Sequence, residues 1–210
     1  MRKFVKEYYF ACVFLIILIF AQWAFSQNVN HDQTDAIKLK EGLYLLSGFA
    51  CNIVVSIGED GLLTADTGHQ SQAEKIISTI MGISGRPIRV VFNTHFHFDH
   101  IGGNEAFAEK GAMIIAQENS RKRMMDEWRV PEILGAKWPT IPPYPEISLP
   151  QIDFNESITV HFNDDTIQAL HFPDAHSDGD AIIYIRKANV IYTGDLYLSI
   201  LFHLVWVIKV

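Results

Sequence analysis

Three histidines and one aspartate fall within six residues, in the segment His95-Phe96-His97-Phe98-Asp99-His100. Imidazole and carboxylate groups are ligands that zinc accepts. His95 and His97 are two residues apart at the end of a predicted strand, so they can point to the same side and reach one metal ion at about 2.0 to 2.1 Å. Asp99 and His100 come after the chain turns and can serve a second ion. A metal-free surface loop is the alternative, but the end of a buried strand is where open sheets place ligand sites.

Two weaker signals follow in the second half of the chain. His176 lies in a polar loop from Pro173 to Asp180, and Asp195 follows a strand in the sequence Tyr192-Thr193-Gly194-Asp195. Taken alone, a loop histidine is commonly just solvated, and a Gly-Asp pair after a strand is commonly a turn. Together with the first cluster, the two residues complete a recognisable pattern.

The first half of the chain alternates strand-like and helix-like segments that must position these residues. Strands are predicted at Leu43 to Ser47, Asn52 to Ile57, Leu62 to Asp66, Ile88 to Phe92 and Ala112 to Ala116. The apolar spacing predicts helices over Gln70 to Met81, near Asn104 to Glu109 and over Glu118 to Trp128. The histidine cluster is expected in a polar loop after the strand that ends at Phe92.

Six prolines between residues 131 and 150 separate this half from a second one. We interpret this segment as a connecting loop, placed to lie over a site. Beyond it the pattern changes to strands, which are predicted at Ile158 to Phe162, Thr166 to Phe172, Ala181 to Ile185 and Val190 to Thr193.

The 210 residues fit one globular domain once the start of the chain is set aside. Arg2, Lys3 and Lys6 precede an uncharged run from Tyr8 to Ala21, and Ala24-Phe25-Ser26 closes the segment. This pattern is typical of a secretory signal peptide, residues 1–26, and a run of about 14 residues is short for a spanning helix. We therefore expect a secreted or periplasmic protein whose domain spans residues 27–210, with no stable membrane anchor after cleavage.

The charge of the chain limits the classes of binding partner, and its cysteine content limits the disulfides that it can form. The formal net charge is -7, and removal of residues 1–26 leaves 14 bases against 23 acids, which argues against nucleic acid and anionic membranes. Cys12 lies in the signal segment, so Cys51 has no disulfide partner within the mature chain. We interpret Cys51 as a small buried residue on a strand.

These motifs, in this order, resemble the metallo-β-lactamase superfamily of hydrolases. The resemblance runs from about Ala36 to Leu196 and rests on the His-x-His-x-Asp-His segment, the loop with His176 and the strand end with Asp195. It implies an α/β (α+β) fold, an αββα sandwich of two similar halves with the metal site at the edge between the sheets. It also implies two zinc ions as cofactors.

The resemblance gives each motif residue a role. His95, His97 and His176 would bind the first zinc, Asp99 and His100 the second, and Asp195 would bridge the two. Asp99 would also orient the nucleophile, which makes it the expected catalytic residue. Asp66, in Ala65-Asp66-Thr67-Gly68, resembles a strand-end aspartate that supports the metal-binding loop, but a plain turn carboxylate fits its position equally well.

Such a centre implies metal-assisted hydrolysis of a small-molecule substrate. Two zinc ions about 3.5 to 4 Å apart lower the pKa of a water toward 7, and the resulting hydroxide attacks a carbonyl. The expected protein is an exported zinc hydrolase acting on an ester, thioester, lactone or amide. A β-lactamase is the alternative, which the signal peptide favours, although Asp195 stands where the best-known zinc β-lactamases carry a Cys ligand. Phosphodiesterase or nuclease action ranks last because the chain is acidic.

The end of the chain departs from the family pattern. Complete members continue beyond the Gly-Asp strand and supply one more histidine to the second zinc, whereas fifteen almost entirely apolar residues, 196–210, follow Asp195 here. His203 lies where the family would not place that ligand, and we interpret it as incidental. The competing hypothesis is therefore a C-terminally truncated, inactive protein with an incomplete second half, an uncovered sheet face and an impaired second zinc site.

Overall fold

The computed structural model describes residues 35–47, 49–129 and 140–197. The chain divides into two units, residues 1–33 and 34–210, and all the described residues lie in the second. The expected signal segment, the apolar tail from residue 198 with His203, and the prolines at 131 and 139 lie outside the described residues. Of the helices that the structure describes, none is long and apolar enough to cross a membrane.

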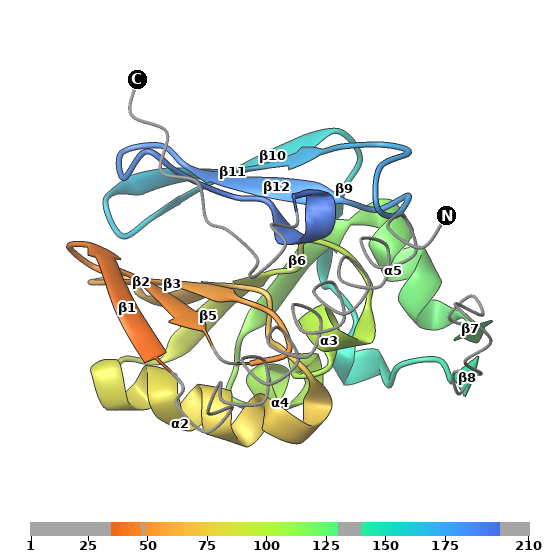
Figure 1. Cartoon of the computed structure of the whole chain (residues 1–210), viewed down its shortest axis with the longest axis horizontal. Coiled ribbons are helices and arrows are strands. Elements are labelled where there is room, and N and C mark those ends of the chain that lie inside the picture. The colour runs from red at the N-terminus through yellow and green to blue at the C-terminus, as the bar shows by residue number, and fades with distance from the viewer. Residues whose placement is uncertain (1–34, 48, 130–139, 198–210) are drawn as a thin grey trace, which may run out of the picture. The chain divides into compact units, whose positions relative to one another are not determined.

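The first half of the described chain forms a seven-stranded mixed sheet (Figure 1). Its order in space is β1-β2-β3-β4-β5-β6-β9. The strands are β1 (Asp35–Lys40), β2 (Leu43–Ser47), β3 (Ile53–Gly58), β4 (Gly61–Ala65), β5 (Ile88–Phe92), β6 (Met113–Gln117) and β9 (Ile152–Phe154). β1 to β4 pair antiparallel, and β4, β5, β6 and β9 pair parallel. Parallel neighbours need crossover connections, and helices lie in each of these crossovers.

Helices cover one face of this sheet, below it in Figure 1. α2 (Ala73–Ile83) buries Ala73, Ile76, Ile77 and Ile80, which recur at helical spacing. The three isoleucines pack with Ile53, Val55 and Val91 of the sheet. α4 (Asn104–Glu109) adds Phe107 to the same cluster. The other helical elements before β9 are η1 (Gln70–Gln72), α3 (Phe98–Ile101), α5 (Glu118–Met125) and η2 (Glu146–Ser148).

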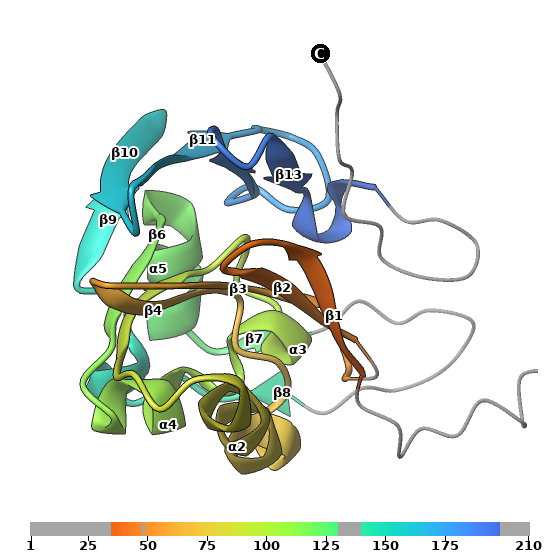
Figure 2. The ribbon, with the colours of Figure 1, turned by 90° about the vertical axis from the view of Figure 1, so that its left-hand side faces the viewer.

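A second, antiparallel sheet stacks on the opposite face of the first (Figure 2). Its strands, in spatial order, are β10 (Ser157–Phe162), β11 (Asp165–His171), β12 (Ala181–Ile185) and β13 (Val190–Tyr192). Val54, Leu63 and Phe92 of the first sheet share one buried cluster with Ile167, Ile183 and Tyr192 of the second. One apolar core therefore joins the two sheets.

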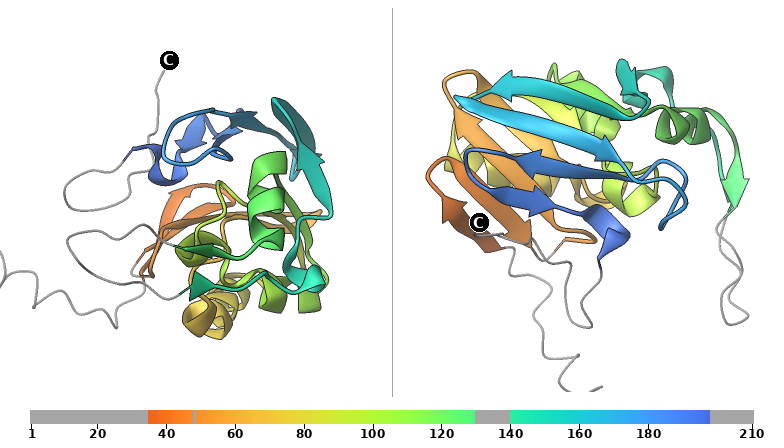
Figure 3. Two further views of the ribbon diagram at one scale, coloured as in Figure 1. Left: turned by 90° about the vertical axis from the view of Figure 1, so that its right-hand side faces the viewer. Right: turned by 90° about the horizontal axis from the view of Figure 1, so that it is seen from above.

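The predicted α/β sandwich is confirmed, with helices over the first sheet. Among the described residues, no helix covers the outer face of the second sheet, as the view from above shows (Figure 3). Leu170, Ile182, Tyr184 and Ile191 alternate with core residues on these strands and are partly exposed.

Several predicted elements need correction. The helix that begins at Glu118 ends at Met125, because Asp126 takes an extended conformation, and Trp128 instead belongs to β7 (Trp128–Arg129), which pairs with β8 (Thr140–Ile141). The segment expected to be a polar loop contains α3. β8 and η2 lie in the proline-rich connection, and β9 directly follows it. Cys51 is buried, as expected, but it precedes β3 and is not on a strand.

Candidate metal centre

The sequence motifs come together at one edge of the sandwich. β4 and β5 are parallel, so Asp66 and the segment that begins at Asn93 leave the first sheet at the same edge. The second sheet contributes the β11–β12 loop, which carries His176, and η3 (Gly194–Leu196), which carries Asp195. The amide of Ala181 donates to the carbonyl oxygen of Thr94 at 2.7 Å and ties the two halves together beside the site.

His95, His97 and His176 form the first group of possible ligands, with one ring nitrogen of each within 4.8 Å of the others. His95 Nε2 lies 3.0 Å from His97 Nδ1, and His176 Nε2 lies 2.8 Å from the same atom. Tetrahedral ligands at about 2.0 to 2.1 Å from zinc are about 3.3 Å apart, so the convergence of these nitrogens suits one metal ion. Burial lowers the pKa of His95 well below its ordinary value and also lowers the pKa of His97. Both rings are thus held in the neutral form that binds metal.

His95, His100 and Asp195 form a second group, again within 4.8 Å of one another. His100 Nε2 lies 3.1 Å from Asp195 Oδ1, and His176 Nε2 lies 3.5 Å from Asp195 Oδ2. Asp195 therefore faces a histidine of each group. Asp99 stands at the rim, where its side chain is 27% exposed and its Oδ2 is 3.7 Å from His100 Nε2.

Asp66 is a fully buried carboxylate behind His100. It accepts hydrogen bonds from His100 Nδ1 at 2.7 Å, from the Thr94 amide and hydroxyl at 2.8 Å each, and from the Tyr192 hydroxyl at 2.9 Å. Its φ of 67° is unusual for a residue other than glycine, and the four donors hold it there. With Nδ1 of His100 bonded to Asp66, Nε2 faces Asp195. Of the two interpretations left open by the sequence, this geometry matches the supporting carboxylate.

The charge on His100 follows from these neighbours. Burial by itself lowers the pKa of His100, but Cys51 and the carboxylates of Asp66 and Asp195 together raise it well above its ordinary value. In the metal-free protein His100 thus holds a proton that a metal ion must displace.

The sequence analysis did not predict that Trp128 and Cys51 lie at the centre. The Trp128 ring stacks on the His97 ring, with centroids 5.4 Å apart and planes 22° apart, and meets Phe96 edge to face at 5.2 Å. Cys51 is close to His100 and Asp66, with a possible ligand atom of each within 4.8 Å of the others. Both lie far along the chain from their partners, and no spacing rule connects them to the histidine segment.

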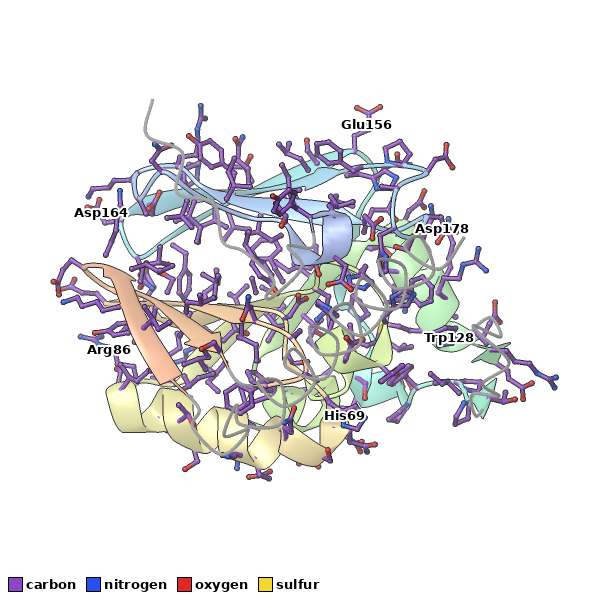
Figure 4. All side chains as sticks on the ribbon, viewed as in Figure 1. His69, Arg86, Trp128, Glu156, Asp164 and Asp178 are labelled. Atoms are coloured by element: carbon purple, nitrogen blue, oxygen red, sulfur yellow. The ribbon has the colours of Figure 1, made fainter. Side chains whose placement is uncertain are left out.

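The loop that carries His176 is fastened to α5. Asn119 Nδ2 donates to the Asp178 carbonyl at 2.9 Å, Ser120 Oγ donates to the Gly179 carbonyl at 3.0 Å, and Arg123 Nη2 donates to the Asp178 carboxylate at 2.8 Å. Figure 4 shows Asp178 beside this helix. The helix after β6 thereby fixes a ligand loop of the second sheet.

The other loop from the second sheet approaches the first sheet closely. Gly194 has a φ of 53°, and a Cβ there would lie 2.6 Å from Thr94 Oγ1. Glycine is therefore required immediately before Asp195, because a side chain would push η3 away from the histidine segment.

Sequence comparison identifies a protein family and several relatives that resemble this chain. The family model of the metallo-beta-lactamase superfamily matches residues 46–205. A linear primary-alkylsulfatase from Pseudomonas sp. (strain ATCC 19151) is 40% identical over 52 residues, which are 24% of this chain and 10% of that protein. A hydroxyacylglutathione hydrolase from Pelagibacter ubique (strain HTCC1062) is 25% identical over 116 residues, which are 54% of this chain and 38% of that protein.

Solved structures with the same fold include metallo-beta-lactamases. A motif mutant of the enzyme from Cronobacter sakazakii has a TM-score of 0.60 at 21% identity, covering 78% of this chain and 61% of that one. MEM-A1, a subclass B3 enzyme isolated from a soil metagenome library, has a TM-score of 0.62 at 19% identity, covering 74% and 59%. This chain thus spans 59–61% of these two structures and less than half of the two curated relatives. With the family model matched over most of its length and the fold shared, the chain belongs to the metallo-beta-lactamase superfamily.

Proposed function

We propose that the protein is a zinc-dependent hydrolase with a dinuclear centre, which cleaves a small-molecule ester, thioester, lactone or amide. The observation that carries the proposal is the convergence of His95, His97 and His176, with His100 and Asp195 beside them, at one edge of the sandwich. Three imidazoles and a nearby carboxylate suit zinc. Membership of the superfamily supports a hydrolytic reaction.

In this proposal His95, His97 and His176 would hold the first zinc, and Asp99, His100 and Asp195 would hold the second. The Asp195 carboxylate faces a histidine of each group. Bound zinc supplies Lewis-acid activation of a water molecule and of the scissile carbonyl. Side chains of the protein accept the proton, exclude water and orient the ligands.

Asp99 is the proposed catalytic carboxylate. Its Oδ2 lies at the solvent rim beside His100, where it accepts a proton from the attacking water and fixes the direction of attack. Phe96 and Trp128 pack on His97 and keep water from one face of its ring. Asp66 keeps His100 in the tautomer whose Nε2 faces the site.

Metal content and turnover test the proposal together. We expect the purified chain to bind two zinc ions, to hydrolyse at least one member of a panel of esters, thioesters, lactones and a chromogenic β-lactam, and to lose this activity with a chelator and regain it with zinc. His97→Ala should lower the turnover by at least about 10²-fold. His161→Ala is the matched control, because His161 lies on β10, where it contacts Thr166, and should leave turnover unchanged. A folded, zinc-loaded chain that hydrolyses nothing would refute the proposal.

β-Lactams enter the panel as one substrate class among several. The two solved metallo-beta-lactamases described above are 21% and 19% identical to this chain, a level at which the likeness shows the fold alone. Turnover confined to the β-lactam would assign that class.

We further propose export of the protein, on the basic start, apolar run and small residues of the segment 1–26. Expression of the full chain with a C-terminal tag in a Gram-negative host, followed by fractionation, tests this. Recovery from the periplasm with a new N-terminus near residue 27 is expected. Full-length protein found only in the cytosol would contradict it.

A further inference from the structure

A cavity of about 460 Å³ lies beside α3, and the six proposed metal ligands do not line it. Three segments form its walls: the turn before α2, the start of α3 and α4, and the proline segment around β8. The lining residues include His69, Phe98, Glu105, Ile141, Tyr144 and the prolines next to Tyr144. A cavity of this size fits a small organic molecule.

Hydrogen bonds and ring contacts fix these walls. The Tyr144 amide donates to the Met124 carbonyl at 2.9 Å, and Asn104 Nδ2 donates to the Ser148 carbonyl at 3.1 Å, so the proline segment is held at two points. The His69 ring meets the Phe98 ring edge to face, with centroids 5.7 Å apart. Figure 4 shows His69 in the lower, helical layer of the unit, away from Trp128. The cavity is therefore formed before any ligand arrives.

The chemistry of the walls defines the ligand. Phe98, Tyr144, Ile141 and the neighbouring prolines present aromatic and aliphatic surface. Glu105 supplies the only carboxylate among the lining residues, and it has no ion-pair partner within the described part of the chain. Aromatic faces and an unpaired carboxylate together favour a cation that is attached to an apolar ring.

The cavity adjoins the metal centre. Phe98 directly precedes Asp99 on α3. Tyr144 is near enough to Asp99 that the carboxylate adds to burial in raising the pKa of Tyr144 to about 12. Tyr144 also packs in the small cluster of Phe96, Ile101 and Met124, with Trp128, which backs the histidine segment. A molecule that occupies the cavity thus lies next to the α3 segment that carries Asp99.

We propose that this cavity binds an aromatic group that bears a cationic amine, and that it holds this part of the substrate while the scissile bond lies at the metal centre. The role in substrate binding rests on the proposed hydrolase function, whereas the binding of the amine does not.

Three probes of matched shape test the binding on the full chain stripped of metal: phenethylamine, 2-phenylethanol and 3-phenylpropanoate. By NMR titration, phenethylamine should bind at least about tenfold more tightly than the neutral alcohol, and the anion should not bind. Glu105→Gln should remove the preference for the amine while leaving the alcohol unaffected. Glu109→Gln is the matched control, because Glu109 lies on the same helix, is exposed and does not line the cavity. Equal binding of all three probes, or no binding of phenethylamine, overturns the proposal.

Kinetics on the zinc-loaded protein test the substrate role with a pair of esters or thioesters that share a leaving group. One carries in its acyl part a phenyl ring with a protonated alkylamine, as in phenethylamine, and the other carries an acetyl group. Glu105→Gln should raise KM about tenfold for the first substrate alone, with kcat unchanged. Binding of phenethylamine without any hydrolysis would overturn the proposed function and leave the cavity assignment standing. Hydrolysis that is indifferent to the amine and to Glu105 would overturn the substrate role alone.

Discussion

Asp66 connects the metal centre to the fold through one buried side chain. Its carboxylate receives donors from the histidine segment, through Thr94 and His100, and from the second sheet, through Tyr192. The Tyr192 hydroxyl also lies 2.6 Å from the Asn52 carbonyl oxygen beside β3. A change at Asp66 therefore alters the packing of both sheets and the orientation of His100 together.

Replacing Asp66 with asparagine should have a larger effect on stability and metal binding than the same replacement at an exposed aspartate. In Asp66→Asn an amide NH₂ takes the place of an oxygen that accepts from His100, Tyr192 or Thr94, so donors face donors. The free energy of unfolding should fall by about 1–3 kcal/mol in a urea titration, and metal affinity at the second group should fall by about 10–100-fold. Asp174→Asn is the control, because Asp174 is exposed and its φ of 55° suits asparagine. Equal effects of the two substitutions would contradict this account.

The two ligand groups should respond differently to pH. The raised pKa of His100 means that this ring is protonated in the metal-free protein near neutral pH, so metal must displace a proton and binding weakens as pH falls. His95 and His97 have lowered pKa values and are neutral over the same range, so a metal ion displaces no proton from these two rings of the first group. In competitive zinc titrations at pH 6, 7 and 8, the zinc affinity of the second group, which contains His100, should fall on acidification before that of the first group does. Parallel loss of both ions would argue against this difference.

At the scale of elements, α5 is the part of the first half that positions a ligand from the second. Its residues donate hydrogen bonds to two backbone carbonyls of the loop that carries His176 and to the side chain of Asp178 in that loop. The β11–β12 loop is thus held from outside its own sheet, which keeps His176 facing His97. The position of α5 after β6 follows from the parallel crossover, so the site depends on the topology of the first sheet.

Arg123 and Lys122, which are neighbours on α5, allow a test of whether this helix positions the loop that carries His176. Arg123 pairs with Asp178 in the ligand loop, whereas Lys122 pairs with Glu118 on its own helix. Both pairs are exposed, so Arg123→Ala and Lys122→Ala should each change the unfolding free energy by less than about 1 kcal/mol. Only Arg123→Ala should weaken zinc binding at the first group, by up to about tenfold in a chelator competition. Equal zinc affinities in the two variants would show that the ion pair does not position His176.

Strong local patterns allowed the main strands and helices to be predicted from the sequence. β2 and β5 match their predicted bounds, because apolar residues there end at clear turn signals. α3 was missed because four residues, three of them polar or aromatic, have no helical periodicity to detect. β9 is three residues long, and its place beside β6 is set by pairing at a distance in the chain. The contacts of Trp128 and Cys51 with the histidine segment depend on tertiary packing in the same way.

At the scale of the whole described unit, one core serves both sheets. Residues of β3, β4 and β5 pack directly on residues of β11, β12 and β13. The metal centre draws ligands from both sheets at the edge of this core, so the sheets must stay together for the ligands to meet. Separation of the two sheets and loss of the centre should therefore be one event.

Ile183 and Ile182, adjacent on β12, test this coupling because they face opposite sides of the second sheet. Ile183 is fully buried in the shared core, and Ile182 is partly exposed on the outer face. Ile183→Ala should lower the free energy of unfolding by about 2–5 kcal/mol, because it leaves a cavity between the sheets, whereas Ile182→Ala should cost well under half as much. Far-UV circular dichroism and retention of zinc, followed in the same urea titration, should give coincident transitions for the wild type and both variants. In Ile183→Ala the midpoint should shift for both signals equally, because zinc is held only while the sheets are joined. Release of zinc at a lower urea concentration than the loss of sheet structure would instead mean that the ligand loops open independently of the core.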